Sequence, residues 1–115
     1  MKGFKRTDRV GSLMRDILSE TLLTSVGDPR VRDVTITRVT VTADFSLARV
    51  YVRALGADQG GREEALKGLA SARGFLRAEV GQRIRLLRVP QLEFHYDDLP
   101  EEIERVERIL DSLKQ

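Results

Sequence analysis

The sequence contains no cysteine and only one histidine, His95. The absence of cysteine excludes a disulfide framework, a thiolate zinc site and a cysteine nucleophile, and a lone imidazole cannot build a multi-histidine metal site. No apolar run approaches the roughly 20 residues of a membrane span, and no apolar stretch follows the basic start to form a secretory signal. We therefore expect a cytoplasmic protein that binds no metal and no membrane.

Residue patterns for enzymatic chemistry are also scarce. The sequence has no Gly-x-x-x-x-Gly-Lys-Ser/Thr phosphate loop. His95 lies in a short predicted strand between aromatic residues, where a histidine is more often a packing residue than a general base. The acidic pairs at 63–64, 97–98 and 101–102 lie at predicted helix starts or turns, where capping and the helix dipole account for them. We expect no catalytic residue, no cofactor and no small-molecule substrate.

What is present suffices for one globular domain. The chain has 115 residues, of which 41% are hydrophobic and 33% are charged. This length provides material for one hydrophobic core. We predict a single domain over residues 1–115, with the core in about 7–100 and an acidic C-terminal helix over about 100–114.

Charge is distributed unevenly along the chain. The net charge is only +2, and arginine supplies 16 of the 20 basic residues. Residues 1–15 carry five basic groups against one acid, and residues 62–88 carry seven against three, whereas residues 101–115 carry three against five. Basic segments of this kind are typical of a surface that binds a polyanion such as nucleic acid. Solvated helix faces are the alternative, and charge alone does not decide between them.

Hydrophobic periodicity predicts the first three elements. Apolar residues at three- and four-residue spacing predict a helix over 7–25. Alternating β-branched residues predict strands over 34–42 and 47–54, which a short turn joins into an antiparallel hairpin. The apolar phase of the first strand slips near Arg38, which predicts a bulge there.

The second half of the chain predicts helices around one more strand. The helical pattern over 62–84 is interrupted at 72–74, where a glycine costs up to about 1 kcal/mol, so we expect two short helices. A strand over 92–96 and an amphipathic helix from residue 98 follow. The order is α-β-β-α-α-β with a C-terminal helix, an α+β fold whose three-stranded sheet is covered by helices. We expect the last helix to pack on the sheet as a lid.

A polar stripe on the second of the two central helices is the strongest sign of binding. Gly74, Arg77, Gly81 and Arg85 are spaced by three, four and four, so they share one side of a helix. Glycines leave room for a sugar-phosphate backbone, arginines bind phosphate in fork geometry, and a helix that begins at Gly74 offers free N–H groups. Alternatively, the glycines permit close packing and the arginines are solvated.

Several short motifs together resemble one family. The element order resembles a type II KH domain, but Ala72-Arg73-Gly74 replaces the KH loop Gly-x-x-Gly. That Ala-x-Gly kink is similar to ribosome-binding factor A, as are Asp28-Pro29-Arg30 after the first helix and Pro90-x-Leu-x-Phe-x-Tyr-Asp in the last strand. The resemblance covers roughly residues 7–100.

The resemblance implies a non-catalytic ribosome assembly factor. Members of the family bind the free small (30S) ribosomal subunit and its 16S rRNA near the decoding centre, assist late rRNA processing and maturation, support cold adaptation, and are released by an assembly GTPase. It implies that Ala72, Arg73, Gly74 and Arg77 face rRNA, with Gly81 and Arg85 on the same stripe. The charge pattern alone adds further rRNA-facing candidates: Lys2, Lys5, Arg6, Arg9, Lys67 and Arg88.

Two alternatives stay open at this point. Many relatives carry a longer, often basic tail, whereas this chain ends in an acidic helix, so a role for such a tail is in doubt here. A protein–protein adaptor, or another RNA-binding KH-like module, is the alternative function. The apolar stripe of residues 103–113 discriminates, because an exposed stripe favours the adaptor and a buried stripe belongs to the core. We expect a monomer.

Overall fold

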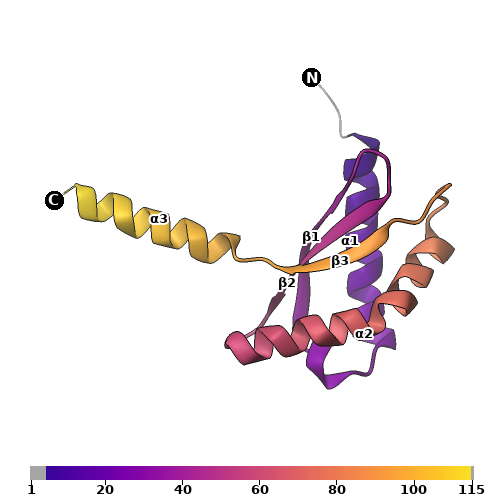
Figure 1. The fold of residues 1–115 in the computed structure, drawn as a ribbon, viewed down its shortest axis with the longest axis horizontal. Coiled ribbons are helices and arrows are strands. Elements are labelled where there is room, and N and C mark those ends of the chain that lie inside the picture. Colours follow the sequence, from indigo (N-terminus) through magenta and orange to yellow (C-terminus); the bar gives the residue numbers. More distant parts are fainter. Residues whose placement is uncertain (1–4, 115) are drawn as a thin grey trace.

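The computed structural model describes residues 5–114 and has α+β architecture, as the sequence predicts. Three α-helices and one short 3₁₀ helix accompany a three-stranded sheet (Figure 1). In chain order the elements are α1 (Arg6–Ser25), η1 (Pro29–Val31), β1 (Val34–Val41), β2 (Leu47–Ala54), α2 (Gln59–Arg83), β3 (Gln91–Tyr96) and α3 (Leu99–Leu113). Within residues 5–114, no helix combines the length and the apolar character that a membrane crossing requires.

The sheet has the strand order β1-β2-β3. The hairpin strands β1 and β2 are antiparallel, and β3 runs parallel to β2 because α2 carries the chain back between them. The register steps from the pair Ile36–Val52 to the pair Arg38–Tyr51, so Thr37 is the extra residue of a bulge. The phase slip near Arg38 therefore marks a real irregularity, and the prediction of a bulge is confirmed.

One core joins α1, α2 and the sheet. Its fully buried side chains include Met14 and Leu18 of α1, Val50 and Val52 of β2, and Leu76 of α2. β2 alternates as predicted, since its even-numbered residues from 48 to 52 are buried whereas Arg49 is exposed. The packing is close where α1 crosses β1, because a Cβ added to Gly11 would lie 2.5 Å from the backbone oxygen of Val39.

The predicted pair of central helices is wrong. Residues 59–83 form one helix, α2, of 25 residues that continues through Ala72-Arg73-Gly74, although its ribbon bends near the middle (Figure 1). A single glycine costs only about 1 kcal/mol in a helix. Leu69 and Leu76, one on each side of the break predicted at 72–74, are completely buried, and burying a leucine is worth about 1.5–3 kcal/mol. Tertiary packing therefore outweighs the local preference.

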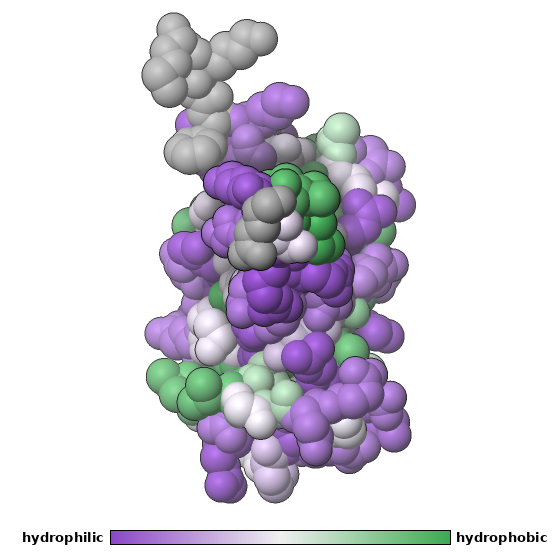
Figure 2. Space-filling view, turned by 90° about the vertical axis from the view of Figure 1, so that its left-hand side faces the viewer, coloured by the Kyte–Doolittle hydropathy of each residue, from purple (hydrophilic) through white to green (hydrophobic). Residues whose placement is uncertain are grey.

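The expectation that the last helix covers the sheet is also wrong. α3 projects away from the rest of the molecule (Figure 1), and none of its residues is buried. Figure 2 views this projecting helix from its free end and shows hydrophobic side chains on one side of it. Its apolar stripe, Ile103, Val106, Leu110 and Leu113, is at least half exposed at every position.

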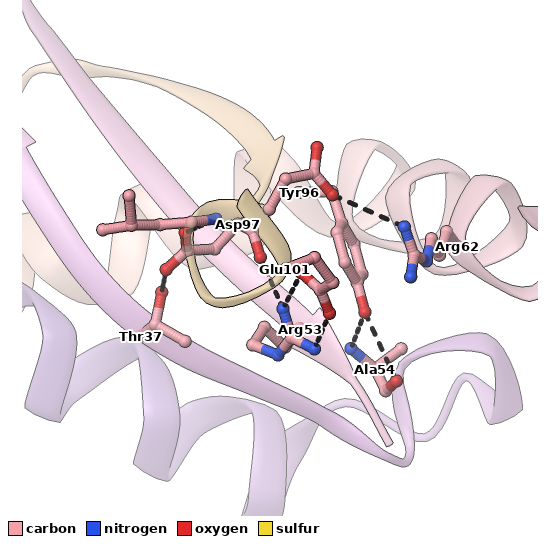
Figure 3. A network of polar contacts seen from close by, with 9 residues as sticks. Thr37, Arg53, Ala54, Arg62, Tyr96, Asp97 and Glu101 are labelled. Carbon is pink, nitrogen blue, oxygen red and sulfur yellow. Dashed lines mark hydrogen bonds and ion pairs between the residues drawn. The ribbon is translucent and has the colours of Figure 1, made fainter. Parts of the chain in front are cut away.

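Arg53 anchors the start of α3 in this direction (Figure 3). Its guanidinium donates to the backbone oxygen of Asp97 at 2.6 Å and to both carboxylate oxygens of Glu101. Asp97 accepts the hydroxyl of Thr37 at 2.7 Å and the backbone N–H of Leu99 at 3.1 Å. We call these contacts among Arg53, Asp97, Glu101, Thr37 and Leu99 the α3 anchor.

The carboxylates of the α3 anchor are held in their ionised form. The hydrogen bond from Arg53 lowers the pKa of Glu101 to about 2. Burial raises the pKa of Asp97, but the hydrogen bonds from Thr37 and Leu99, together with the nearby charges of Arg38 and Arg53, leave this pKa below its ordinary value. Because both groups are charged at neutral pH, the anchor holds the first turn of α3 beside the end of β3.

Candidate nucleic-acid interface

Three segments that are far apart in the sequence meet at one end of the molecule. They are the start of α1, the turn between β1 and β2, and the segment between α2 and β3. The guanidinium of Arg6 lies 5.1 Å from the ring centre of Phe45. Arg6 also lines two adjoining hollows, one of about 150 Å³ with Arg88 and one of about 420 Å³ with Gly81 and Arg85.

Several of the predicted basic residues gather at this end. Lys5 precedes Arg6 at the start of α1, and Arg9 lies one turn further along the same helix. All these side chains are exposed. We call this surface the basic end and define it by Lys5, Arg6, Arg9, Arg85 and Arg88.

The cations of the basic end make no ion pair with a neighbouring acid in the described residues, although Asp44 lines the smaller hollow beside Arg6 and Arg88. None of its five members makes an ion pair within residues 5–114. By contrast, Arg30 pairs with Asp28 at 2.7 Å, and Arg83 pairs with Glu20. Arginines without acidic partners keep their fork of N–H donors available for phosphate oxygens.

The turn between β1 and β2 places Phe45 beside Arg6. Phe45 has a positive φ of 59°, a conformation that costs a residue other than glycine about 1 kcal/mol or more. Hydrogen bonds stabilise the turn, because Asp44 Oδ1 accepts the side chain and backbone N–H of Ser46 and the hydroxyl of Thr42. These bonds, led by the one from the Ser46 side chain, lower the pKa of Asp44 to about 2. The turn is therefore charged and fixed at neutral pH.

The polar stripe predicted on α2 has different surroundings from those expected, above all at its two glycines. Gly74 lies inside a continuous helix, so the expectation of free N–H groups at a helix start there is wrong. A Cβ added at Gly74 would meet no atom within 4 Å, whereas at Gly81 it would meet Val89 Cγ2 at 3.2 Å. Gly74 thus leaves open surface, while Gly81 serves the close packing that was its alternative explanation.

The two arginines near this stripe lie against other parts of the protein. Arg77 is half-buried, and it donates from Nε to the backbone oxygen of Pro90 at 3.1 Å and from Nη2 to that of Val89 at 2.7 Å. Arg73 lies 5.7 Å from the ring centre of Phe94. Arg77 therefore holds the segment that follows α2, and its predicted contact with rRNA would have to compete with these hydrogen bonds.

The remaining predicted residues lie away from the basic end. Ala72 lines a separate hollow of about 300 Å³ with Phe75 and Gly27. Lys67 pairs with Glu64 on the exposed side of α2, with an N–O distance of 3.3 Å. Lys2 lies outside the described residues. The structure thus brings the terminal cations together with Gly81, Arg85 and Arg88, but not with the Ala-x-Gly segment.

Sequence reasoning missed three apolar residues of this surface. Leu86 and Leu87 line both hollows, and Phe45 lines the smaller one. Leu87 is fully exposed between Arg85 and Arg88. The sequence does contain a sign of Leu86 and Leu87. These two adjacent leucines among arginines fit neither the apolar stripe of the helix before them nor the alternation of the strand after them.

Comparison with known proteins gives consistent matches over most of the chain. The family model for ribosome-binding factor A matches residues 6–110. The crystal structure of ribosome-binding factor A from Thermus thermophilus is 29% identical over 80% of this chain and 97% of that chain, with a TM-score of 0.69. A homology model of the Thermus thermophilus factor was fitted into a cryo-EM map of its complex with the 30S subunit. It is 30% identical over 79% of this chain and 94% of that chain, with a TM-score of 0.64.

A third similar structure comes from another organism. It is the solution NMR structure of a Thermotoga maritima protein provisionally described as a ribosome binding factor A. It is 32% identical over 83% of this chain and 90% of that chain, with a TM-score of 0.72. The α+β fold, with the element order α-β-β-α-β-α, is therefore shared with proteins of this name.

Proposed function

Because the chain belongs to the ribosome-binding factor A family, we propose that it binds the free small (30S) ribosomal subunit through its 16S rRNA. In this role it assists late rRNA processing and maturation in the cytoplasm. The observation that carries the proposal is the basic end, whose five cations make no ion pair within residues 5–114, and three of which, Arg6, Arg85 and Arg88, line the two hollows. The complex described for the Thermus thermophilus factor supports the choice of the 30S subunit as partner.

The proposed mechanism is electrostatic and steric rather than catalytic. Arg6, Arg85 and Arg88 bind backbone phosphates, and the shape of the end selects a site on folded rRNA. A protein that binds in this way stabilises one rRNA conformation and must leave when maturation is complete. Release by an assembly GTPase and action as a monomer belong to the same proposal.

Co-sedimentation with purified 30S subunits tests this proposal. We expect the double variant Arg6→Glu/Arg85→Glu to bind at least about tenfold more weakly, because two attractive contacts with phosphate become repulsive. The matched control is Arg105→Glu/Arg108→Glu on α3, which makes the same change in net charge at exposed positions away from the basic end. Equal losses for the two variants would show that net charge, and not the basic end, determines binding.

The exposure of α3 favours a second candidate function, a protein–protein adaptor. Leu99, Ile103, Val106, Leu110 and Leu113 follow a four-three-four-three spacing, which is typical of helices that pair with an apolar partner. At 100° per residue, Glu102 and Glu107 flank this stripe on opposite sides. These acids disfavour pairing with a second α3 and favour a partner whose apolar surface is flanked by lysine or arginine.

The variant Val106→Asp/Leu110→Asp tests the adaptor role. Both side chains are about half exposed, so we expect the unfolding temperature to be unchanged while binding to the isolated proteins of the 30S subunit is lost. The matched control, Glu104→Asp/Arg108→Lys, keeps the stripe and changes only its polar side. Retained binding by the stripe variant would remove the support for an adaptor.

A further inference from the structure

The basic end combines positive charge with apolar surface in a way that phosphate binding alone does not explain. Leu86 and Leu87 line both hollows, together with Ile84 in the larger one and Phe45 in the smaller one. Leu87 is fully exposed to solvent, although the segment around it carries two charged arginines. Isolated exposed leucines are common on proteins, but this leucine shares the lining of the two hollows with other apolar residues, beside the charged Arg6, Asp44, Arg85 and Arg88.

The combination of apolar and positively charged surface matches the base and the phosphate of a nucleotide. A base presents a flat apolar face and a phosphate presents negative charge, so a binding site needs apolar or planar groups beside cations. Arg6 sits between the hollows and lies over Phe45, which leaves its planar guanidinium available for both stacking and phosphate contact. The larger hollow, at about 420 Å³, lies in the size range of small-ligand sites.

We propose that the two hollows of the basic end form a site for an unpaired nucleotide of RNA. The base lies against Leu86 and Leu87, and Arg85 and Arg88 hold the flanking phosphates. A base within a duplex is stacked and paired, so its face cannot reach this lining, whereas an unpaired base in a loop or single strand can. This inference rests on the proposed function because it names the form of rRNA that the basic end would select.

The site is distinct from the predicted Ala-x-Gly segment. Ala72 lines another hollow, and Arg73 lies over Phe94 instead of near Arg6. Of the predicted polar stripe, Gly81 and Arg85 line the larger hollow, and of these two only Gly81 lies within α2. The proposal therefore assigns base recognition to Leu86 and Leu87 of the segment after α2, which the sequence motifs did not single out.

Fluorescence anisotropy with two RNA probes tests the site. The probes are a single-stranded RNA of about 12 nucleotides and the same strand annealed to its complement. We expect Leu87→Ala to lower the affinity for the single strand about tenfold and to leave duplex binding unchanged. The matched control is Leu55→Ala, because Leu55 is 86% exposed but follows the opposite end of β2. The variant Arg85→Ala/Arg88→Ala should bind both probes more weakly, since both probes carry phosphates.

Unchanged single-strand binding by Leu87→Ala, or an equal loss for both probes, would overturn the site. Vesicles of phosphatidylglycerol serve as a second anionic probe, and binding to them that depends on Leu87 would assign the surface to lipid and overturn the site as well. The outcome is separable from the proposed function. Leu87-dependent RNA binding by a protein that fails to sediment with 30S subunits supports the site and contradicts the function, and the reverse pattern does the opposite.

Discussion

At the scale of single residues, two glycines of α2 have opposite surroundings. A Cβ at Gly74 would meet nothing within 4 Å, whereas at Gly68 it would lie 2.8 Å from Val31 Cγ1 and 3.0 Å from Arg30 Cβ. Gly68 is therefore required for the contact between α2 and η1. Gly74 has no such packing role, which leaves binding as an explanation for its place in the helix.

We expect Gly74→Ala to raise the free energy of unfolding by up to about 1 kcal/mol, because alanine is the better helix former. Gly68→Ala should lower it by about 1–3 kcal/mol through overpacking. Urea denaturation measures both changes. A stabilised Gly74→Ala variant that binds 30S subunits more weakly would support the rRNA contact that the family resemblance implies. A destabilised one would show that the bend of α2 needs glycine.

At the scale of elements, periodic patterns located the strands and α1 correctly, because each buries one face of a regular period. The continuity of α2 could not be predicted locally, since it depends on the burial of Leu69 and Leu76 against distant segments. The predicted position of α3 is wrong for another reason. Amphipathicity shows which side of a helix is apolar, but it does not show whether anything covers that side.

The α3 anchor gives a prediction about pH. The pKa of Glu101 is lowered from 4.5 to about 2 by its hydrogen bond with Arg53. A carboxylate with a lowered pKa stabilises its contact fully above its ordinary pKa and loses that contribution as the pH falls toward the lowered value. We therefore expect the orientation of α3 to be fixed at neutral pH and to loosen between about pH 4.5 and pH 2.

Distance measurements between two spin labels check this prediction without interference, since the chain has no native cysteine. Labels at Leu23→Cys and Ser112→Cys should give a narrow distribution at neutral pH that broadens on acidification. Glu101→Gln should broaden it at neutral pH, whereas Glu104→Gln should not, because among residues 5–114 Glu104 pairs only with Arg108, which lies within α3 itself. A narrow distribution in Glu101→Gln would show that another contact orients the helix.

At the scale of the whole molecule, the small net charge conceals a separation of charge. The basic end adjoins the start of β3, and the acidic helix α3 follows its end, so the strand separates them. This separation was visible in the sequence as two basic segments and an acidic tail. The proximity of Arg6 to Arg85 and Arg88 could not be seen in the sequence, because tertiary folding brings together segments that lie about 80 residues apart.

The separation of charge also explains how one small chain could contact two partners. In the proposed function the basic end presents cations to rRNA, while α3 presents an apolar stripe flanked by acids at a distance from it. An acidic helix packed on the basic end would compete with phosphate. The open position of α3 therefore keeps the proposed rRNA surface accessible.

The salt dependence of binding to 16S rRNA tests the central claim most directly. Each phosphate contact contributes about −0.7 to −0.9 to the slope of log affinity against log salt concentration. We expect a steep slope for the unmodified protein and a slope shallower by about 1.4–1.8 for Arg6→Gln/Arg85→Gln, with Arg105→Gln/Arg108→Gln unchanged. Equal slopes for all three proteins would contradict the account, because the basic end would then make no phosphate contacts.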